Sequence, residues 1–164
     1  MSRDPVSHDP MTEWANLHAP TLADLEVLAQ DAYGRLPEAF RLLCEGVVIR
    51  VEDFPDDETM AEMGCETPFD LLGLFRGIGL AQGGAMMQTG QFPNMVWLYR
   101  RPLLDYWAEH EESLGSLVTH VLVHEIGHHF GLSDEDMEAI EAAAGEDCSR
   151  RDHLGSSRCA SALI

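Results

Sequence analysis

The chain has 164 residues, of which 45% are hydrophobic and 24% charged, as expected for one globular domain with a single core. Its 10 basic and 29 acidic residues give a net charge of −19, which repels nucleic-acid phosphates and anionic membranes. We therefore expect neither nucleic acid nor a membrane as a partner. No apolar run approaches the roughly 18 residues of a membrane-spanning helix. The polar start offers no signal peptide, which predicts a cytoplasmic protein with reduced cysteines.

Composition divides the chain into three parts. Residues 1–20 contain three prolines and are predicted to be a flexible leader. Residues 148–164 are polar, without a hydrophobic period, and are predicted to be a flexible tail. The folded domain is expected to span residues 21–147.

The first elements of this domain follow from local patterns. A helix is predicted to begin with Thr21 as its N-cap and to be broken into two pieces by Gly34 and Pro37. Residues 47–55 and 69–80 are then predicted to contain strands. The acidic segment between these two strands indicates a loop or a short helical turn.

Residues 81–93 are rich in glycine and predict a connection to a third strand within residues 94–104. Pro102 lies near the end of that segment and favours an edge position in the sheet. A long helix is predicted to end near Gly131, followed by a second helix with Ser133 as its N-cap. This order of elements predicts an α+β domain in which helices back a small sheet.

The long helix carries the sequence HEIGHHFG, which begins at His124. At about 100° per residue, His128 lies about 40° from His124, so both imidazoles can reach one ion. On the same helical projection, Glu125 lies about 100° from His124, beside the face that carries the two histidines. Its carboxylate can there contact a water molecule without binding the metal. The opposite side of the helix is apolar. We therefore predict His124 and His128 as metal ligands and Glu125 as the catalytic base.

Zinc requires a third protein ligand and an open position for water. Gly131 can adopt a positive φ, end the helix and turn the chain back, which makes Asp134 the nearest carboxylate able to complete the site. Glu138 and Glu141 on the next helix are the alternatives. Two histidines and a carboxylate also suit other divalent first-row metals.

Further residues are candidates for supporting roles. His120 lies one turn before His124 and is either a supporting group or a rival ligand. His129 is expected to point away from the metal. Tyr99, Arg100 and Arg101 are candidates to stabilise the oxyanion, because an edge strand beside the cleft can also pair with an extended peptide.

The motif HEIGHHFGLSD is similar to the metzincin form of the zincin signature, with Asp134 as its last residue. The segments LLGLFRG, VWLYRRPLL and HVLVHEIGHHFGLSDEDMEAIE resemble the small bacterial minimal-zincin family of metallopeptidases, over about residues 47–141. This resemblance implies a small mixed sheet of three to four strands packed against helices, including an active-site helix. It also implies zinc on His124, His128 and Asp134, with Glu125 as the base.

The leading hypothesis is a zinc metallopeptidase that acts on peptides or unfolded protein segments. One alternative is a zinc amidohydrolase that does not cleave peptides. Another is a zincin-fold module that binds metal or protein without turnover. The metallo-endonucleases of ribosomal RNA maturation have similar ligand spacing, but they lack the glutamate after the first histidine, and the charge of −19 argues against RNA. The sequence leaves the oligomeric state open.

Overall fold

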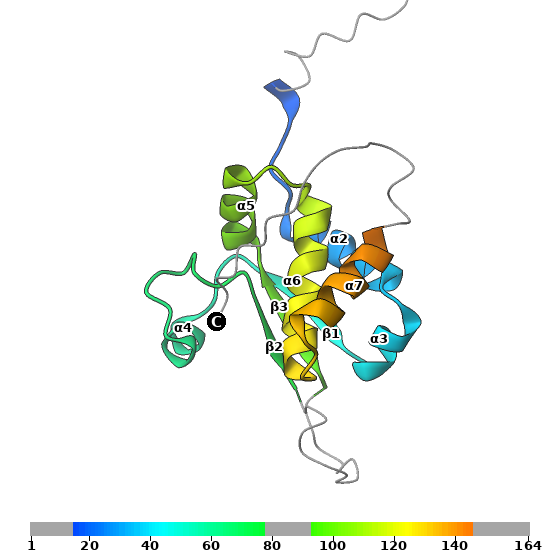
Figure 1. The fold of residues 1–164 in the computed structure, drawn as a ribbon. Coiled ribbons are helices and arrows are strands. Elements are labelled where there is room, and N and C mark those ends of the chain that lie inside the picture. Colours follow the sequence, from blue (N-terminus) through cyan, green and yellow to red (C-terminus); the bar gives the residue numbers. More distant parts are fainter. Residues whose placement is uncertain (1–14, 78–92, 146–164) are drawn as a thin grey trace, which may run out of the picture.

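The computed structural model describes residues 15–77 and 93–145. Three strands form its sheet: β1 (Val48–Glu52), β2 (Gly73–Arg76) and β3 (Met95–Tyr99). Their order is β1-β3-β2, with β1 parallel and β2 antiparallel to the central β3 (Figure 1). This arrangement confirms the prediction of an α+β fold with a small mixed sheet.

Helices account for most of the remaining described residues. The N-terminal helix breaks between Arg35 and Glu38, as Gly34 and Pro37 predict, and Thr21 forms a capping box with Asp24. The acidic segment after β1 forms a short helix rather than a loop. The helices are α2 (Leu22–Arg35), α3 (Glu38–Leu43), α4 (Asp57–Met63), α5 (Arg100–Glu109), α6 (Leu114–His129) and α7 (Asp134–Gly145).

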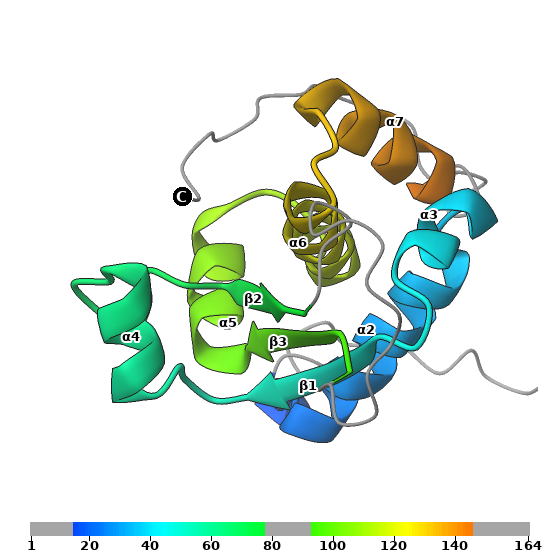
Figure 2. The ribbon, with the colours of Figure 1, turned by 90° about the horizontal axis from the view of Figure 1, so that it is seen from below.

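The two faces of the sheet bury different clusters because side chains alternate along each strand. Helices α2 and α6 cover one face, where Val96 and Leu98 join the main core. On the other face, Leu74 and Tyr99 belong to a smaller apolar cluster. Figure 2 shows α6 end-on beside β2, with α7 packed on the side of α6 that faces away from the sheet. The candidate residues of α6 therefore lie between β2 and α7.

The prediction of an edge position for the third strand is wrong, because β3 is the central strand. The strand ends at Tyr99, and Pro102 lies in the first turn of α5. A proline there lacks only an N–H that would have no partner within the helix, so it removes no hydrogen bond from the sheet. The proline marks a change from strand to helix, not a sheet edge.

Several predictions reach beyond the described residues. The leader at 1–20 and the connection at 81–93 fall largely outside them, and the tail at 148–164 falls wholly outside. Among the cysteines that the structure describes, Cys44 and Cys65 are free thiols. None of the helices within residues 15–77 and 93–145 combines the length and the apolar character needed to cross a membrane.

Candidate metal centre

Helix α6 presents three histidines along one side. Ser113 caps its N-terminus by accepting a hydrogen bond from the backbone N–H of Ser116. The ring centroids of His120 and His124 lie 4.0 Å apart, and those of His124 and His128 lie 5.4 Å apart. His128 is exposed, whereas the other two rings are partly buried.

The end of α6 turns the chain back as predicted. Gly131 has a φ of 72°, its N–H bonds to the carbonyl of His128, and the N–H of Leu132 bonds to the carbonyl of Gly127. These two bonds form a Schellman motif, which requires a left-handed residue at the position of Gly131. Ser133 then exchanges hydrogen bonds with Asp136 at the start of α7, so the predicted N-cap is confirmed.

Close packing holds α7 against α6. A Cβ atom added to Gly127 would lie 2.5 Å from the sulfur of Met137, whose side chain is fully buried. Helix α7 therefore approaches α6 at a residue without a side chain. Glu141 lies one turn after Met137, and this packing places it beside His120 and His124 of α6.

The carboxylate of Glu141 lies between His120 and His124. Both of its oxygens lie 3.1 Å from Nδ1 of His120, and Oε1 lies 3.2 Å from Nε2 of His124. The ligand atoms of these three residues all lie within 4.8 Å of one another. Two imidazoles and one carboxylate are a donor set that zinc uses in catalytic sites.

The oxygen Oε1 of Glu141 fits a metal ligand. It is buried, and Nδ1 of His120 and Nε2 of His124 both lie within 3.2 Å of it. Two imidazole nitrogens and a carboxylate oxygen this close together fit the donor set that zinc prefers, so His120, His124 and Glu141 fit a zinc ion.

The charge state of Glu141 agrees with a role as a metal ligand. Burial alone would raise the pKa of Glu141, but the polar contacts with His120 and His124 outweigh burial, and the pKa falls to about 2. The hydrogen bond with Glu141 raises the pKa of His120 against the opposing effect of burial. The glutamate is therefore an anion at neutral pH, as a metal ligand must be.

Glu125 lies on the other side of His124, against β2. Its carboxylate accepts a hydrogen bond from the backbone N–H of Phe75, and burial raises its pKa although that bond and His124 oppose the rise. Gly73 makes this approach of β2 possible. A Cβ there would lie 2.7 Å from Val121 and 3.3 Å from Cγ of Glu125. The strand thus fixes the position of a carboxylate with a raised proton affinity.

The structure does not bring Asp134 into the group formed by His120, His124 and Glu141. Asp134 is exposed in the first turn of α7, beyond the C-terminal end of α6. Glu138 is also exposed, one turn before Glu141. The sequence motif favours Asp134 as the third ligand and leaves Glu141 as an alternative. The spacing of Glu141 in α7 is the sequence feature that indicates its position, because Glu141 shares one helix face with the buried Met137 and Ala144.

The predicted oxyanion residues have other contacts. Tyr99 lies in the cluster on the far face of the sheet. Arg100 forms an ion pair with Asp53, and the guanidinium of Arg101 lies 5.8 Å from the ring centroid of Phe54. These contacts direct none of the three toward the histidines of α6.

His129 does not join the row of histidines. Its ring lies 4.1 Å from the ring of Phe75, centroid to centroid, on the sheet side of the helix. The prediction that it points away from the metal agrees with this position.

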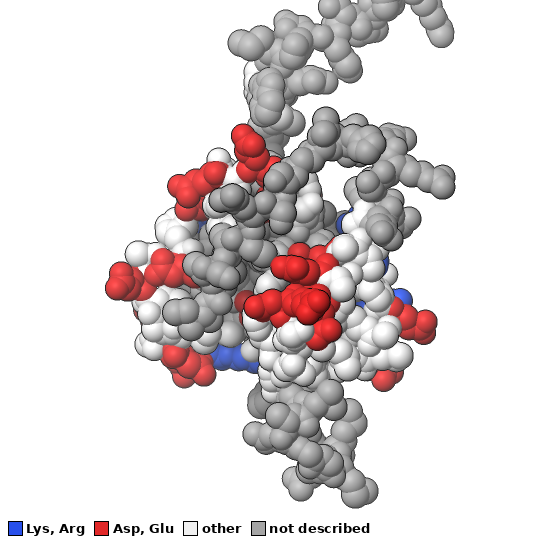
Figure 3. All heavy atoms as spheres, in the orientation of Figure 1, with Lys and Arg blue, Asp and Glu red and all other residues white. Residues whose placement is uncertain are grey.

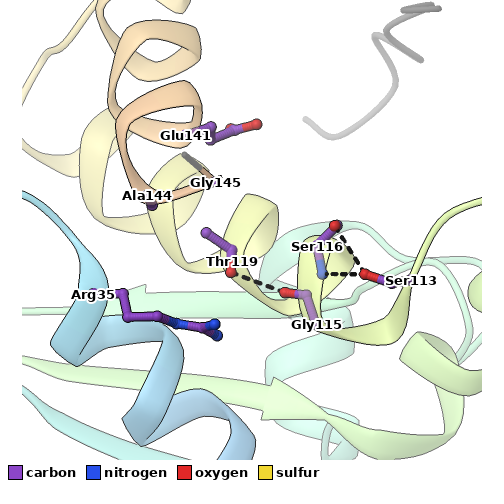
Figure 4. A pocket seen from close by; sticks show the side chains of 8 residues that line it. All are labelled: Arg35, Ser113, Gly115, Ser116, Thr119, Glu141, Ala144 and Gly145. Atoms are coloured by element: carbon purple, nitrogen blue, oxygen red, sulfur yellow. Dashed lines mark hydrogen bonds between the residues drawn. The ribbon is translucent and has the colours of Figure 1, made fainter. Parts of the chain in front are cut away.

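A cavity of about 260 Å³ lies beside Glu141 (Figure 4). It is hollowed between α2, the first turns of α6 and the end of α7. None of the side chains of the HExxH motif lines it. Its lining residues are Arg35, Ser113, Gly115, Ser116, Thr119, Glu141, Ala144 and Gly145.

The family model for zincin-like metallopeptidases matches residues 44–144, well over half of the chain. The chain belongs to the zincin-like metallopeptidase family. The match includes the whole sheet, the HExxH helix and α7 up to Ala144. This zincin-like membership supports a hydrolase and a metal, usually zinc, at the level of the family. No match was found among curated proteins.

Proposed function

We propose that the protein is a zinc metallopeptidase that cleaves peptides or unfolded protein segments. The observation that carries this proposal is Glu125, a partly buried carboxylate beside His124 that β2 holds in place. The family match supports the same conclusion at a coarser level. We propose His124 and His128 as zinc ligands during turnover, with Asp134 as the third ligand that the motif implies.

The proposed reaction depends on the proton affinity of Glu125. When bound, zinc supplies Lewis-acid chemistry, by polarising the substrate carbonyl and making water more acidic. The carboxylate of Glu125 removes a proton from the attacking water and donates it to the leaving amine. Burial raises the pKa of Glu125 and so favours this proton transfer. The N–H of Phe75 keeps the carboxylate in place throughout.

The surface charge supports a neutral or basic substrate. Acidic side chains gather over α7, which is next to the candidate centre (Figure 3). They include Asp134, Glu135 and Asp136 in its first turn. An acidic peptide would be repelled there, whereas a basic segment would be concentrated near the site.

The experiment is a comparison of wild type and Glu125→Gln on a library of unstructured peptides, with zinc content measured in both. We expect the variant to keep its zinc and to lose about 10²–10⁴-fold in kcat, the usual contribution of a general base. Glu135→Gln removes the same charge from exposed α7 and should leave kcat unchanged. Equal turnover by wild type and Glu125→Gln would refute the role of Glu125.

One observation favours a second candidate function. The cavity beside Glu141 is lined by Glu141 but not by His124, Glu125 or His128, so it lies next to the motif rather than over it. This feature suits a module that binds metal or a protein partner without turnover. Zinc-loaded wild type that cleaves no peptide in the library, yet binds zinc tightly, would favour this function.

A further inference from the structure

The cavity beside Glu141 lies at one end of the row of histidines on α6. Ser116 lines this cavity and precedes His120 and His124 at intervals of four residues, so the three side chains project from successive turns on one side of the helix. Glu141 lines the cavity and also lies 3.2 Å from Nε2 of His124. A ligand in the cavity is therefore next to the candidate metal centre.

We propose that this cavity binds the C-terminal carboxylate of the substrate peptide and that Arg35 recognises it. The cavity is called the carboxylate pocket from here on. The peptide class of the ligand rests on the proposed function, whereas the recognition of a carboxylate rests on the residues of the cavity alone.

Arg35 is the cation of the carboxylate pocket, and Figure 4 shows its side chain reaching from α2 toward the first turns of α6. The other charged residue of the lining is Glu141, whose charge is paired with His120 and His124. One nitrogen of Arg35, Nη2, lies 3.1 Å from Asp31, an exposed partner one turn earlier in α2. Such exposed pairs contribute little, and a guanidinium has five N–H donors, so Arg35 can also bind a carboxylate through two parallel hydrogen bonds.

Two serine hydroxyls at the start of α6 add a hydrogen-bond donor to the pocket. The hydroxyl oxygens of Ser113 and Ser116 lie 2.9 Å apart, and the backbone N–H of Ser116 donates to Oγ of Ser113. Two hydroxyls have two O–H groups and the bond between them uses one, so the second O–H can donate to a carboxylate. The positive end of the α6 dipole attracts an anion to the same place.

The size of the pocket suits the end of a peptide. Its volume of about 260 Å³ lies below the roughly 300–1,000 Å³ of sites for larger ligands. Ser113 and Ser116 are exposed, whereas Ala144 is buried, so the pocket opens at the first turn of α6. A chain whose last residue fills the pocket can leave through this opening.

The spacing along α6 predicts where such a peptide is cut. His124 follows Ser116 by eight residues (124 − 116), which is about 12 Å at about 1.5 Å per residue. An extended peptide covers this length with about three or four residues. Hydrolysis beside Glu125 would therefore release a short C-terminal fragment and leave a new carboxylate on the remaining chain. A basic peptide that ends in a single carboxylate suits both this pocket and the acidic surface over α7.

Calorimetric titration of the zinc-loaded full chain with N-acetylalanine tests the pocket without turnover. We expect N-acetylalanine amide to bind at least about tenfold more weakly, because it cannot make a charge-assisted bond with Arg35. Arg35→Gln should raise the Kd for N-acetylalanine to that of the amide. Arg50→Gln removes the same charge from an exposed residue of β1 and should keep the difference.

Equal Kd values for the acid and the amide in wild type would overturn the pocket. A preference for the acid that survives in Arg35→Gln would also overturn it, by placing the carboxylate elsewhere. Inorganic phosphate that binds as tightly as N-acetylalanine and displaces it would refute the assignment to the end of a peptide.

A measurement on unmodified protein covers the case in which Arg35→Gln does not fold. N-acetylalanine should shift the amide NMR resonances of Gly115, Ser116 and Gly145, which line the pocket. Shifts confined to other parts of the chain would contradict the proposal.

Peptides of one basic sequence, with free and with amidated C-termini, test the pocket during turnover. Wild type should show a KM at least about tenfold higher for the amidated peptide with a similar kcat, because the bond to Arg35 forms equally in the ground state and the transition state. Arg35→Gln should remove this difference. Equal KM values in wild type would overturn the pocket, whereas absent turnover with the preference for N-acetylalanine intact would refute only the peptidase function.

Discussion

At the scale of single residues, the candidate centre depends on one residue that lacks a side chain as much as on those that carry charge. Gly73 allows β2 to approach α6 so closely that the N–H of Phe75 reaches Glu125. Any side chain at residue 73 would meet Val121 on one side and the backbone oxygen of Trp97, at 3.1 Å, on the other. The backbone oxygen cannot move without disturbing the sheet.

We therefore expect Gly73→Ala to lower the free energy of unfolding by about 1–3 kcal/mol, the usual cost of overpacking a core. It should also reduce kcat, because Glu125 is displaced. Urea unfolding and peptide turnover measure the two effects. Gly34→Ala is the control, since a Cβ there meets no atom within 4 Å and the substitution removes a glycine from a helix, for a gain of up to about 1 kcal/mol. Equal stability of the two variants would contradict this account.

At the scale of elements, the contact between α6 and α7 determines where Glu141 lies. Met137 fills the space above Gly127, and the same face of α7 carries Glu141 one turn later. The position of Glu141 beside His120 and His124 therefore depends on the contact between Gly127 and Met137, neither of which can bind a metal through a charged side chain.

We expect Gly127→Ala to push α7 outward, to cost about 1–3 kcal/mol of stability and to weaken zinc binding. Met137→Ala alone should cost about 2–5 kcal/mol because it leaves a cavity. In the double variant the added methyl group partly fills that cavity, so the two losses should sum to more than the measured loss. A double-mutant cycle by chemical denaturation tests this coupling, and strict additivity would show that the two residues do not share one contact.

Capping aspartates make the helices sensitive to acid. The side chain of Ser133 lowers the pKa of Asp136, and Thr21 does the same for Asp24. A carboxyl whose folded pKa is lowered stabilises the protein above its unfolded pKa of about 3.9, and this contribution disappears as the pH falls through the lowered value.

The difference in unfolding free energy between wild type and Asp136→Asn should therefore shrink as the pH falls from about 5 to about 2. Thermal or urea unfolding across this range measures it. Asp105→Asn, at an exposed residue of α5, serves as the control. A difference that grows in acid would reverse the sign and contradict the capping role.

At the scale of the whole molecule, a metal that binds only the folded state must stabilise the fold. At a free zinc concentration of 100 times the Kd, the expected gain is about 2.7 kcal/mol. For a chain of this size, that gain corresponds to a rise in Tm of about 5–10 °C. A chelator should reverse the rise.

His124→Ala is the decisive control for this measurement, because His124 belongs both to the group that it forms with His120 and Glu141 and to the HExxH motif. Its Tm should not respond to zinc. An equal rise in wild type and in His124→Ala would show that the zinc bound elsewhere, and no rise in wild type would show that the folded protein has no tight metal site.

The sequence by itself determined the features that depend on neighbours along the chain. The caps at Thr21 and Ser133, the helix end at Gly131 and the shared face of the motif histidines follow from local backbone geometry, and the structure has them. The family resemblance depended on three contiguous segments, LLGLFRG, VWLYRRPLL and the motif helix with its continuation, and the family match confirms the family.

Only the tertiary structure decided which distant groups meet. Pro102 misled the strand assignment because a proline is tolerated equally at a sheet edge and in the first turn of a helix. Glu141 reaches His120 and His124 across 21 and 17 residues because Met137 packs on Gly127. Glu125 meets Phe75 because Gly73 has no side chain. Packing between elements depends on the shapes of their surfaces, which local sequence patterns do not encode. The motif therefore predicted the kind of chemistry, and only the tertiary structure showed which residues lie beside the motif side chains.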